Sequence, residues 1–374
     1  MNKKNILIII GLLVIFFGLG ISLDISLDSN KITNSFKIIL GLEQFSSNQN
    51  TFDVEFFENN YSQYIHVKSV DDISKLKIKL INYIWKENTL DYSNFPRNIE
   101  KNIVDQNYSD LKNLKQIDKF IVSMEYDVNS ISYLFLPNNS NNNLIIYHQG
   151  HDGDFKNGKK TIEYFLKNGY SVLAFSMPLL GMNNQPIVDT EFGKIKLVSH
   201  EYFRFIESQN FSPLKFYFEP LSSSLNYIEN NFNFTNFYMI GISGGGWTTT
   251  VYSAIDERIS KSFSIAGSIP LSLRINVNDL GDYEQTLPNF YKIANYLDLY
   301  ILSSYGDNRK HVQIFNEYDP CCFSGNLFKN YENQITIIVS QLGKGSFQIY
   351  LDDTHYEHKI SENALDIIIK EMEQ

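Results

Sequence analysis

The segment FYMIGISGGGWTTTVYSAI, residues 237–255, carries the strongest structural signal in the chain. The apolar run 237–240 predicts a buried strand, and 245–254 predicts a helix. Between them, Gly241-Ile242-Ser243-Gly244-Gly245 fits the pattern G-x-S-x-G, which requires this strand–turn–helix setting. A plain glycine-rich turn and a phosphate loop are the alternatives. A phosphate loop would place a lysine after the glycines, where this chain has Trp247-Thr248-Thr249.

A serine at the centre of such a turn is suited to nucleophilic catalysis. Flanking glycines let the strand and the helix approach each other without Cβ clashes, while the strained turn projects the serine Oγ above the carboxyl edge of the sheet. The N–H of the next residue, Gly244, then points at the oxyanion that develops during attack, and the helix N-terminus adds partial positive charge there. We therefore interpret Ser243 as a nucleophile.

The rest of the chain from about residue 118 alternates short apolar runs with helical patterns. Strands are predicted at 120–126, 131–136, 144–147, 170–175, 262–266, 311–315 and 347–351, and further helices at 161–168, 218–231 and 361–373. Alternation of this kind predicts an α/β fold, with a mostly parallel twisted sheet covered by helices on both faces. The sequence contains no internal repeat.

With these motifs in this order, residues 118–374 resemble the α/β-hydrolase superfamily, and its serine esterases in particular. An early strand leads into Tyr147-His148-Gln149-Gly150-His151, the nucleophile turn follows, and an acid and a histidine come after two late strands. The order Ser, acid, His is the one that this superfamily uses. The resemblance implies a Ser-Asp-His triad that works through an acyl-enzyme.

The acid and the histidine are assigned from their places after the late strands. Asp319, in the run Asn316-Glu317-Tyr318-Asp319-Pro320, is the candidate acid that would hold the imidazole tautomer. Its rivals are Asp307, Asp282 and Glu317, and a solvated turn aspartate is the simpler reading. For the histidine we favour His358, because the run from His358 to Ser361 resembles a pattern in some esterase-like members, where the catalytic histidine lies three residues before a Ser or Thr that caps the last helix. The alternative is His355, which lies closer to the strand end.

The loop motif His148-x-Gly150 resembles the segment that supplies the second oxyanion donor in this superfamily. By that resemblance the donor is the backbone N–H of His151. A metal site competes with this interpretation, because the run HQGHDGD clusters two histidines, His148 and His151, with two aspartates. No further ligand motif is visible, so we expect no metal and no cofactor.

Two segments lie outside this pattern. The connection at about 179–213 is too long for an ordinary loop, and its aromatic residues suit either a lid over a pocket or a subdomain packed on the sheet edge. Residues 24–117 form an N-terminal extension whose role the sequence does not reveal.

The N-terminus predicts a membrane anchor. Residues 1–5, with Lys3 and Lys4, form a short cytoplasmic tail, and the uncharged apolar run 6–23 is close to the lower length of a spanning helix. The lysines before it and the acids after it predict the N-terminus inside and the catalytic domain outside. A cleaved signal sequence, which would give a secreted protein, is the alternative.

Composition excludes other classes. Hydrophobic residues make up 43% and charged residues 20% of the chain, as in globular proteins. The net charge of -10, with no basic surface evident, argues against a nucleic-acid partner. The two cysteines, Cys321 and Cys322, are adjacent and could form a vicinal disulfide or remain free thiols beside the site.

Together these features predict a serine hydrolase that cleaves an ester or related acyl bond, carboxylesterase-like rather than a peptidase or an acyltransferase. The substrate would be a small molecule or a surface ester. The alternatives are an inactive binding protein on the same fold and a metal-dependent hydrolase using His148 and His151. The sequence leaves the oligomeric state open.

Overall fold

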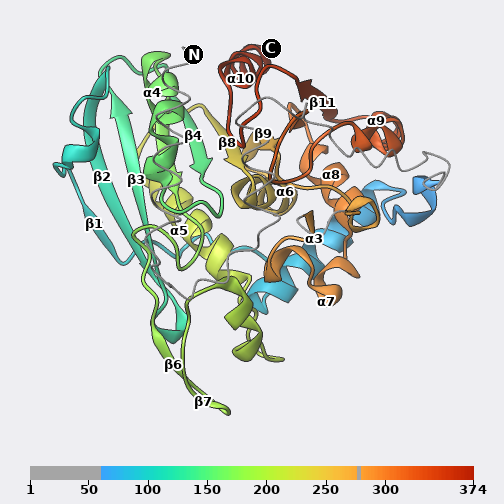
Figure 1. Cartoon of the computed structure of the whole chain (residues 1–374), viewed down its shortest axis with the longest axis horizontal. Coiled ribbons are helices and arrows are strands. Elements are labelled where there is room, and N and C mark those ends of the chain that lie inside the picture. Colours follow the sequence, from blue (N-terminus) through green and yellow to red (C-terminus); the bar gives the residue numbers. More distant parts are fainter. Residues whose placement is uncertain (1–59, 276–278) are drawn as a thin grey trace, which may run out of the picture. The chain divides into compact units, whose positions relative to one another are not determined.

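The computed structural model describes residues 60–275 and 279–374. In these ranges the main sheet has the strand order β1-β2-β3-β5-β4-β8-β9-β10-β11 (Figure 1). One edge is antiparallel, formed by β1 (Asn98–Glu100), β2 (Leu114–Ser123) and β3 (Asn129–Pro137), with β3 antiparallel to β5. The sheet therefore begins within the N-terminal extension, since β1 pairs with β2.

The remaining strands run parallel. They are β5 (Ser171–Phe175), β4 (Asn143–His148), β8 (Asn236–Ile242), β9 (Ile259–Ile265), β10 (Lys310–Asn316) and β11 (Ser346–Asp352). The mostly parallel sheet expected from the sequence is confirmed. Because parallel strands present their carboxyl ends at one edge, the loops after β4, β8, β10 and β11 meet there.

Helices cover both faces of the sheet. On one face, α4 (Lys159–Lys167) and α10 (Glu362–Glu373) pack over a hydrophobic cluster. On the other lie α5 (Lys215–Asn231), α6 (Gly244–Ile255) and α8 (Tyr296–Ser304), with α3 (Val70–Trp85) against α6. Helix α9 (Glu332–Gln341) packs against β11 and α8, and the short α7 (Pro288–Tyr291) precedes α8.

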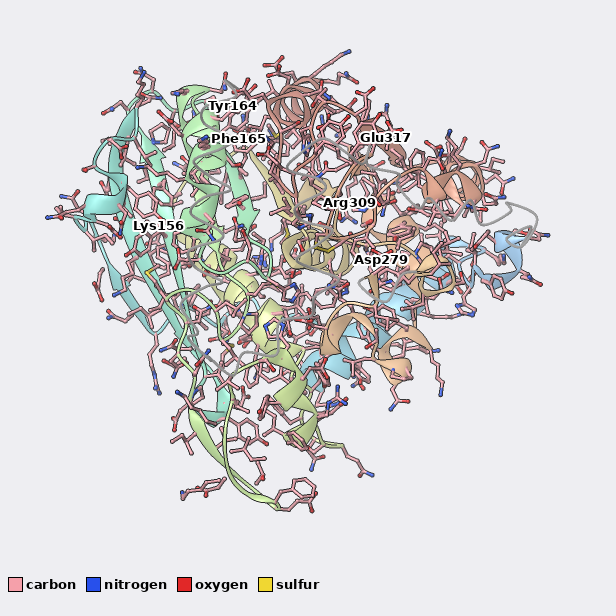
Figure 2. The ribbon with its side chains drawn as sticks, in the orientation of Figure 1. Lys156, Tyr164, Phe165, Asp279, Arg309 and Glu317 are labelled. Carbon is pink, nitrogen blue, oxygen red and sulfur yellow. A yellow bond between two sulfur atoms is a disulfide. The ribbon has the colours of Figure 1, made fainter. Side chains whose placement is uncertain are left out.

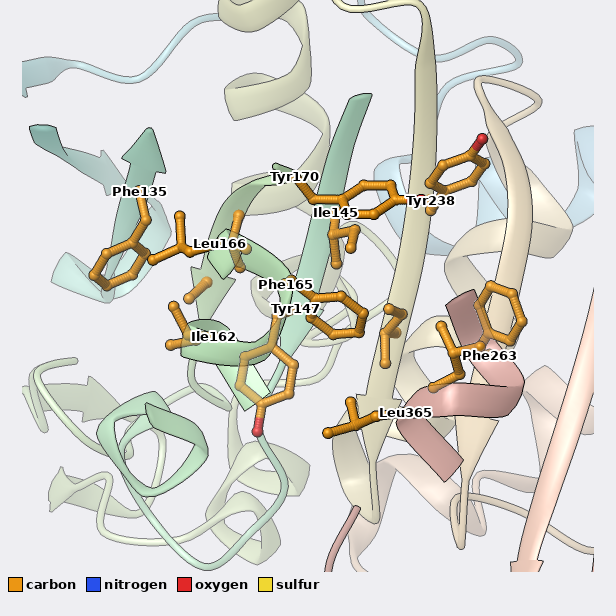
Figure 3. Packing of buried hydrophobic residues seen from close by; sticks show 14 of the residues in the cluster. Phe135, Ile145, Tyr147, Ile162, Phe165, Leu166, Tyr170, Tyr238, Phe263 and Leu365 are labelled. Atoms are coloured by element: carbon orange, nitrogen blue, oxygen red, sulfur yellow. The ribbon is translucent and has the colours of Figure 1, made fainter. Parts of the chain in front are cut away.

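Side-chain alternation along the strands builds the two cores. On β4, Ile145 and Tyr147 belong to the cluster under α4 and α10, where they meet Ile162 and Phe165 of α4 (Figure 3). Successive strand residues point to opposite faces, so Ile146 faces the α5–α6 side. There an aromatic layer fills the space, formed by Tyr217, Phe218, Trp247 and Tyr252.

The long connection after β5 contains a small hairpin and a 3-10 segment. The hairpin consists of β6 (Ile187–Thr190) and β7 (Gly193–Lys196), and in Figure 1 it projects away from the main sheet and its helices. The 3-10 segment His200–Phe205 is packed against the rest of the domain, with His200 and Phe203 buried. The insertion thus has an exposed part and a packed part.

The predicted anchor at residues 6–23 lies outside the described residues, as do residues 24–59 of the extension that follows it. Within 60–275 and 279–374, none of the helices combines the length and the apolar character that crossing a membrane requires.

A buried ion pair holds the end of α6, the helix that begins at Ser243. Asp256 is fully buried and accepts hydrogen bonds from Tyr252 Oη at 2.6 Å and from Arg258 Nη2 at 2.6 Å. Burial alone would raise the pKa of Asp256, but the Arg258 guanidinium and the hydrogen bonds bring it below its usual value. The ionised form is therefore the one that stabilises the fold.

We predict that Asp256→Asn lowers the free energy of unfolding by about 3 kcal/mol at neutral pH, because Arg258 loses a buried charged partner. Since the folded-state pKa lies below the unfolded one, this contribution is present above about pH 4 and is lost as the pH falls through the folded-state value. Urea denaturation of wild type and variant, at neutral pH and below about pH 4, measures the difference.

The matched control is Asp307→Asn, which removes an exposed ion pair to Lys344 and should cost less than about 1 kcal/mol. Equal losses at the two positions, or a loss at Asp256 that does not shrink at low pH, would contradict the argument.

Candidate active site

Ser243 lies on a strained turn between β8 and α6. Its backbone angles are φ 56° and ψ -127°, a region that L-residues adopt only under constraint. The turn is held by the Ser243 N–H, which donates to Ile265 O at 2.9 Å, and by the Trp247 N–H, which donates to Ser243 O at 3.0 Å. The sequence prediction of a sharp strand–turn–helix at this position is thus met by the local geometry.

Glycines are required around this turn by close backbone approaches. A Cβ on Gly241 would collide with the Gly245 carbonyl, and one on Gly245 with the His148 carbonyl. On the neighbouring loop, a Cβ on Gly150 would lie 2.7 Å from Ser243 Cβ. The turn and the loop after β4 therefore pack backbone to backbone, and no side chain fits between them.

The predicted acid and the favoured histidine form a pair. Asp319 Oδ2 lies 2.7 Å from His358 Nδ1, across 39 residues of sequence. Asp319 also accepts from Asn316 Nδ2 at 3.1 Å and from the Cys321 N–H at 2.8 Å. Although burial alone would raise the pKa of Asp319, its bond to His358 and these donors bring it below the usual value. Asp319 is thus an ionised partner for the imidazole.

His355, the alternative histidine, lies in a different environment. Its Nε2 is 3.4 Å from Asp352 Oδ2 without forming a hydrogen bond, and its Nδ1 accepts from the Glu357 N–H at 3.3 Å. Asp352 itself accepts from Thr354 and Ser361. His355 therefore belongs to the network that shapes the turn before α10, and it makes no contact with Asp319 that resembles the His358 bond.

Ser243 and His358 line the same cavity. It has a volume of about 480 Å³, and its wall includes Gln149, Asp152, Lys159, Lys160 and Lys359. His358 Nε2, the ring atom away from Asp319, is buried without a hydrogen-bond partner in the described chain. No hydrogen bond joins it to Ser243 Oγ in the described residues, although the two residues line one cavity.

The rival acids lie elsewhere. Asp307 pairs with Lys344 on the surface at 2.7 Å. Glu317, labelled in Figure 2, directly follows β10, and its N–H donates to Asp352 O. Asp282 lies with a pair of histidines described below. None of the three has a contact with His358 comparable to that of Asp319.

His148 and His151 have separate surroundings. The His148 ring is buried, stacks on Phe175 and faces Gln149 O through Nδ1 at 2.9 Å, and burial lowers its pKa to about 4. The His151 ring instead lies against Gly244, where a Cβ would collide with it. The loop motif thus places His148 at the carboxyl end of β4 and His151 beside Gly244, the residue after Ser243.

His151 also belongs to a group that the sequence did not reveal. Its Nε2 lies near His200 of the insertion and near Asp282 and Glu284 of a later loop, and all four side chains converge. Asp282 was considered only as a triad acid, and no motif marks His200 or Glu284. His148 is not a member of this group. Because its members come from three distant segments, no spacing in the sequence could have revealed it.

The adjacent cysteines are joined in a disulfide, Cys321–Cys322. Both of their backbone N–H groups donate to Asp319 Oδ1, at 2.8 and 3.3 Å. Of the two states that the sequence left open, the structure has the vicinal disulfide, and the turn that carries it helps to position the acid.

Comparisons with known proteins bear on the fold. No protein-family model matches the chain, and no curated protein matches its sequence. Among solved structures, acetyl xylan esterase 1 from Thermoanaerobacterium sp. JW/SL YS485 aligns with a TM-score of 0.54 and 13% identity, over 83% of this chain and 96% of that one. The acetyl xylan esterase from Paenibacillus sp. R4 gives 0.55 and 9%, over 83% and 97%.

An S-formylglutathione hydrolase from Agrobacterium tumefaciens gives a TM-score of 0.50 and 15% identity, over 74% of this chain and 99% of that one. Identities this low carry information on the fold alone, but each alignment spans nearly the whole of the known structure. Together with the strand order and the turn at Ser243, they show that this chain has the α/β-hydrolase fold.

Proposed function

We propose that the protein is a serine esterase in which Ser243, His358 and Asp319 act as a triad. The observation that carries this proposal is the shared cavity. It is lined both by Ser243, on a strained strand–helix turn, and by His358, whose Nδ1 is hydrogen-bonded to the buried carboxylate of Asp319. Each of the three groups follows a different parallel strand, which brings them to one edge of the sheet.

The mechanism follows from these positions. His358 Nε2 takes the Ser243 proton as Oγ attacks the ester carbonyl, while Asp319 holds Nδ1–H and stabilises the imidazolium. The Gly244 N–H, the first of α6, stabilises the oxyanion together with the helix N-terminus, and the His151 N–H is the proposed second donor. His358 then protonates the leaving alcohol, and water hydrolyses the acyl-enzyme by the same steps in reverse.

The surroundings favour a small acyl group on a polar alcohol. Next to Gly244 the space is filled by the His151 ring and by Met177, whose Cε would lie 2.9 Å from a Cβ at Gly244. The cavity that Ser243 shares with His358 also has charged side chains in its wall, among them Lys159, Lys160 and Lys359. The known acetyl xylan esterases of the same fold act, by name, on acetylated sugar polymers, and a short acyl ester of a polyol fits this cavity.

We predict that Ser243→Ala lowers kcat on an acetyl ester by about 10⁴-fold or more, because the nucleophile is lost, while the melting temperature stays unchanged. A fluorophosphonate probe should label the wild type and not the variant. Hydrolysis that persists in the variant, or labelling at another residue, would remove Ser243 from the mechanism.

The same assay should distinguish His358 from His355 by the loss of kcat that each substitution causes. We expect His358→Asn to reduce kcat by at least about 10⁴-fold, since no base remains for Ser243, and Asp319→Asn to have an effect of similar size. His355→Asn is the matched control and should retain activity within about tenfold, because His355 bonds only to its own turn. A larger loss at His355 than at His358 would reverse the assignment.

Acyl-chain length tests the substrate proposal. We expect kcat/KM for p-nitrophenyl acetate to exceed that for the octanoate, because His151 and Met177 leave little room beside Gly244. Each methylene that the site cannot accommodate should cost roughly 1 kcal/mol or more. A profile that rises with chain length would show instead that the acyl group lies in an apolar channel.

A further inference from the structure

Four ligand-type side chains converge beside the nucleophile turn. His151 Nε2 lies 3.2 Å from His200 Nδ1, 3.0 Å from Glu284 Oε1 and 3.1 Å from Asp282 Oδ2. His200 Nδ1 lies 3.2 Å from Glu284 Oε2 and 3.6 Å from Asp282 Oδ2. Glu284 is fully buried, and the His200 side chain is 2% exposed.

The ring protons of the two histidines cannot give every one of these converging atoms a hydrogen-bond partner. His200 Nε2 lies 2.9 Å from Pro178 O. Because a carbonyl oxygen can only accept a hydrogen bond, Nε2 carries a proton, and a neutral His200 presents a lone pair at Nδ1. His151 Nε2 then faces three acceptors and can donate to only one. If both rings were protonated, two N–H groups would face each other at 3.2 Å. With both rings neutral, the two carboxylates are left without a compensating positive charge.

A metal ion at the centre removes this conflict. Tetrahedral ligands at about 2.0–2.1 Å from zinc lie about 3.3–3.4 Å apart. The three separations among His151 Nε2, His200 Nδ1 and Asp282 Oδ2 run from 3.1 to 3.6 Å. Glu284 turns one carboxylate oxygen to each histidine, and one ligand atom from each of the four residues lies within 4.8 Å of the others. Two imidazoles and two carboxylates suit zinc, whereas calcium and magnesium prefer oxygen ligands alone. Two neutral histidines and two carboxylates also balance a divalent charge.

We propose that His151, His200, Asp282 and Glu284 form a tetrahedral Zn²⁺ site. This proposal departs from the sequence-based expectation that the protein binds no metal, and it is a different site from the His148–His151 pair considered there. Four protein ligands fill the tetrahedral shell, which is the arrangement of structural rather than catalytic zinc sites. The ion would therefore position the surrounding segments and leave the acyl chemistry to Ser243.

The groups behind the ligands agree with such a site. The His200 Nε2–H bond to Pro178 O fixes the tautomer that leaves Nδ1 for the metal. Tyr217 Oη donates to Glu284 Oε2 at 2.8 Å, and Tyr291 Oη donates to Glu284 O at 3.0 Å. Metal-bound histidines and carboxylates are usually oriented by outer bonds of this kind.

The ion would join three segments, one of which packs on the turn at Ser243. His151 belongs to the loop after β4 that packs on Gly244 and Ser243, His200 to the insertion after β5, and the two acids to the loop around the 3-10 segment Tyr283–Gln285. The insertion would thus be held against the active-site loop through its buried 3-10 segment, while the β6–β7 hairpin remains exposed.

Metal analysis of the purified full chain tests the proposal. After dialysis against Zn²⁺ and removal of free ion, elemental analysis should give about one zinc per chain for the wild type, and His200→Asn and Glu284→Gln should lose it. His66→Asn is the matched control: His66 pairs with Asp298 instead, so this variant should keep the wild-type zinc content. A wild type that binds no zinc, or equal zinc content in all variants, would overturn the site.

Three further measurements keep the test decisive if a buried variant fails to fold. Asp282 is 47% exposed in its side chain, so Asp282→Asn should fold and bind zinc at least about tenfold more weakly. In the wild type, a chelator should lower the melting temperature and added Zn²⁺ should restore it. Co²⁺ in place of zinc should give the intense visible absorption of a tetrahedral site. An unchanged melting temperature and a weak octahedral spectrum would both count against the site.

The outcome is independent of the proposed esterase activity. Ser243→Ala should bind as much zinc as the wild type, because the serine is not a ligand. A protein that binds zinc without hydrolysing esters would retain this site and lose the proposed function, and the converse result would do the opposite.

Discussion

The backbone of Ser243 is the constraint on which the site depends. A positive φ at a non-glycine residue persists only where the surrounding structure enforces it. Here close backbone approaches enforce it, because Gly241 lies against the Gly245 carbonyl and Gly245 lies against the His148 carbonyl at the end of β4. The strain is sustained by a fully buried helix, whose far end is fixed by Asp256 and Arg258. A local turn of five residues thus relies on packing across the whole α5–α6 face.

The sheet order converts that turn into a site. Because β8, β9, β10 and β11 are parallel neighbours, Ser243, Asp319 and His358 all follow strand ends at one edge, although they are separated by up to 115 residues in the chain. The acid is placed by its own short turn, in which Asn316 and two cysteine N–H groups fix its carboxylate. The histidine ring is then oriented by a single bond to Asp319.

Much of this could be predicted from sequence, because it is local. Apolar runs such as 144–147 and 311–315 lie within β4 and β10, and the glycine spacing around Ser243 predicted the turn. The preference for His358 over His355 was harder to reach from sequence, because both residues follow β11. The carboxylate that lies beside each ring, Asp319 at His358 and Asp352 at His355, is set by the tertiary structure. Helix α8 went unnoticed because it is buried on all sides and lacks an amphipathic period.

The cluster around His151 was beyond such reasoning, yet it bears on the same catalytic requirement. An oxyanion donor is effective only if it is fixed before the charge develops, and ordering a loop costs roughly 1–2 kcal/mol per residue in backbone entropy. The loop after β4 is anchored at its start by the Gln149 N–H bond to Phe175 O. Two residues further on, the His151 ring contacts His200, Asp282 and Glu284. A metal at that point would fix the ring, and with it the backbone N–H, beside Gly244 without entering the reaction.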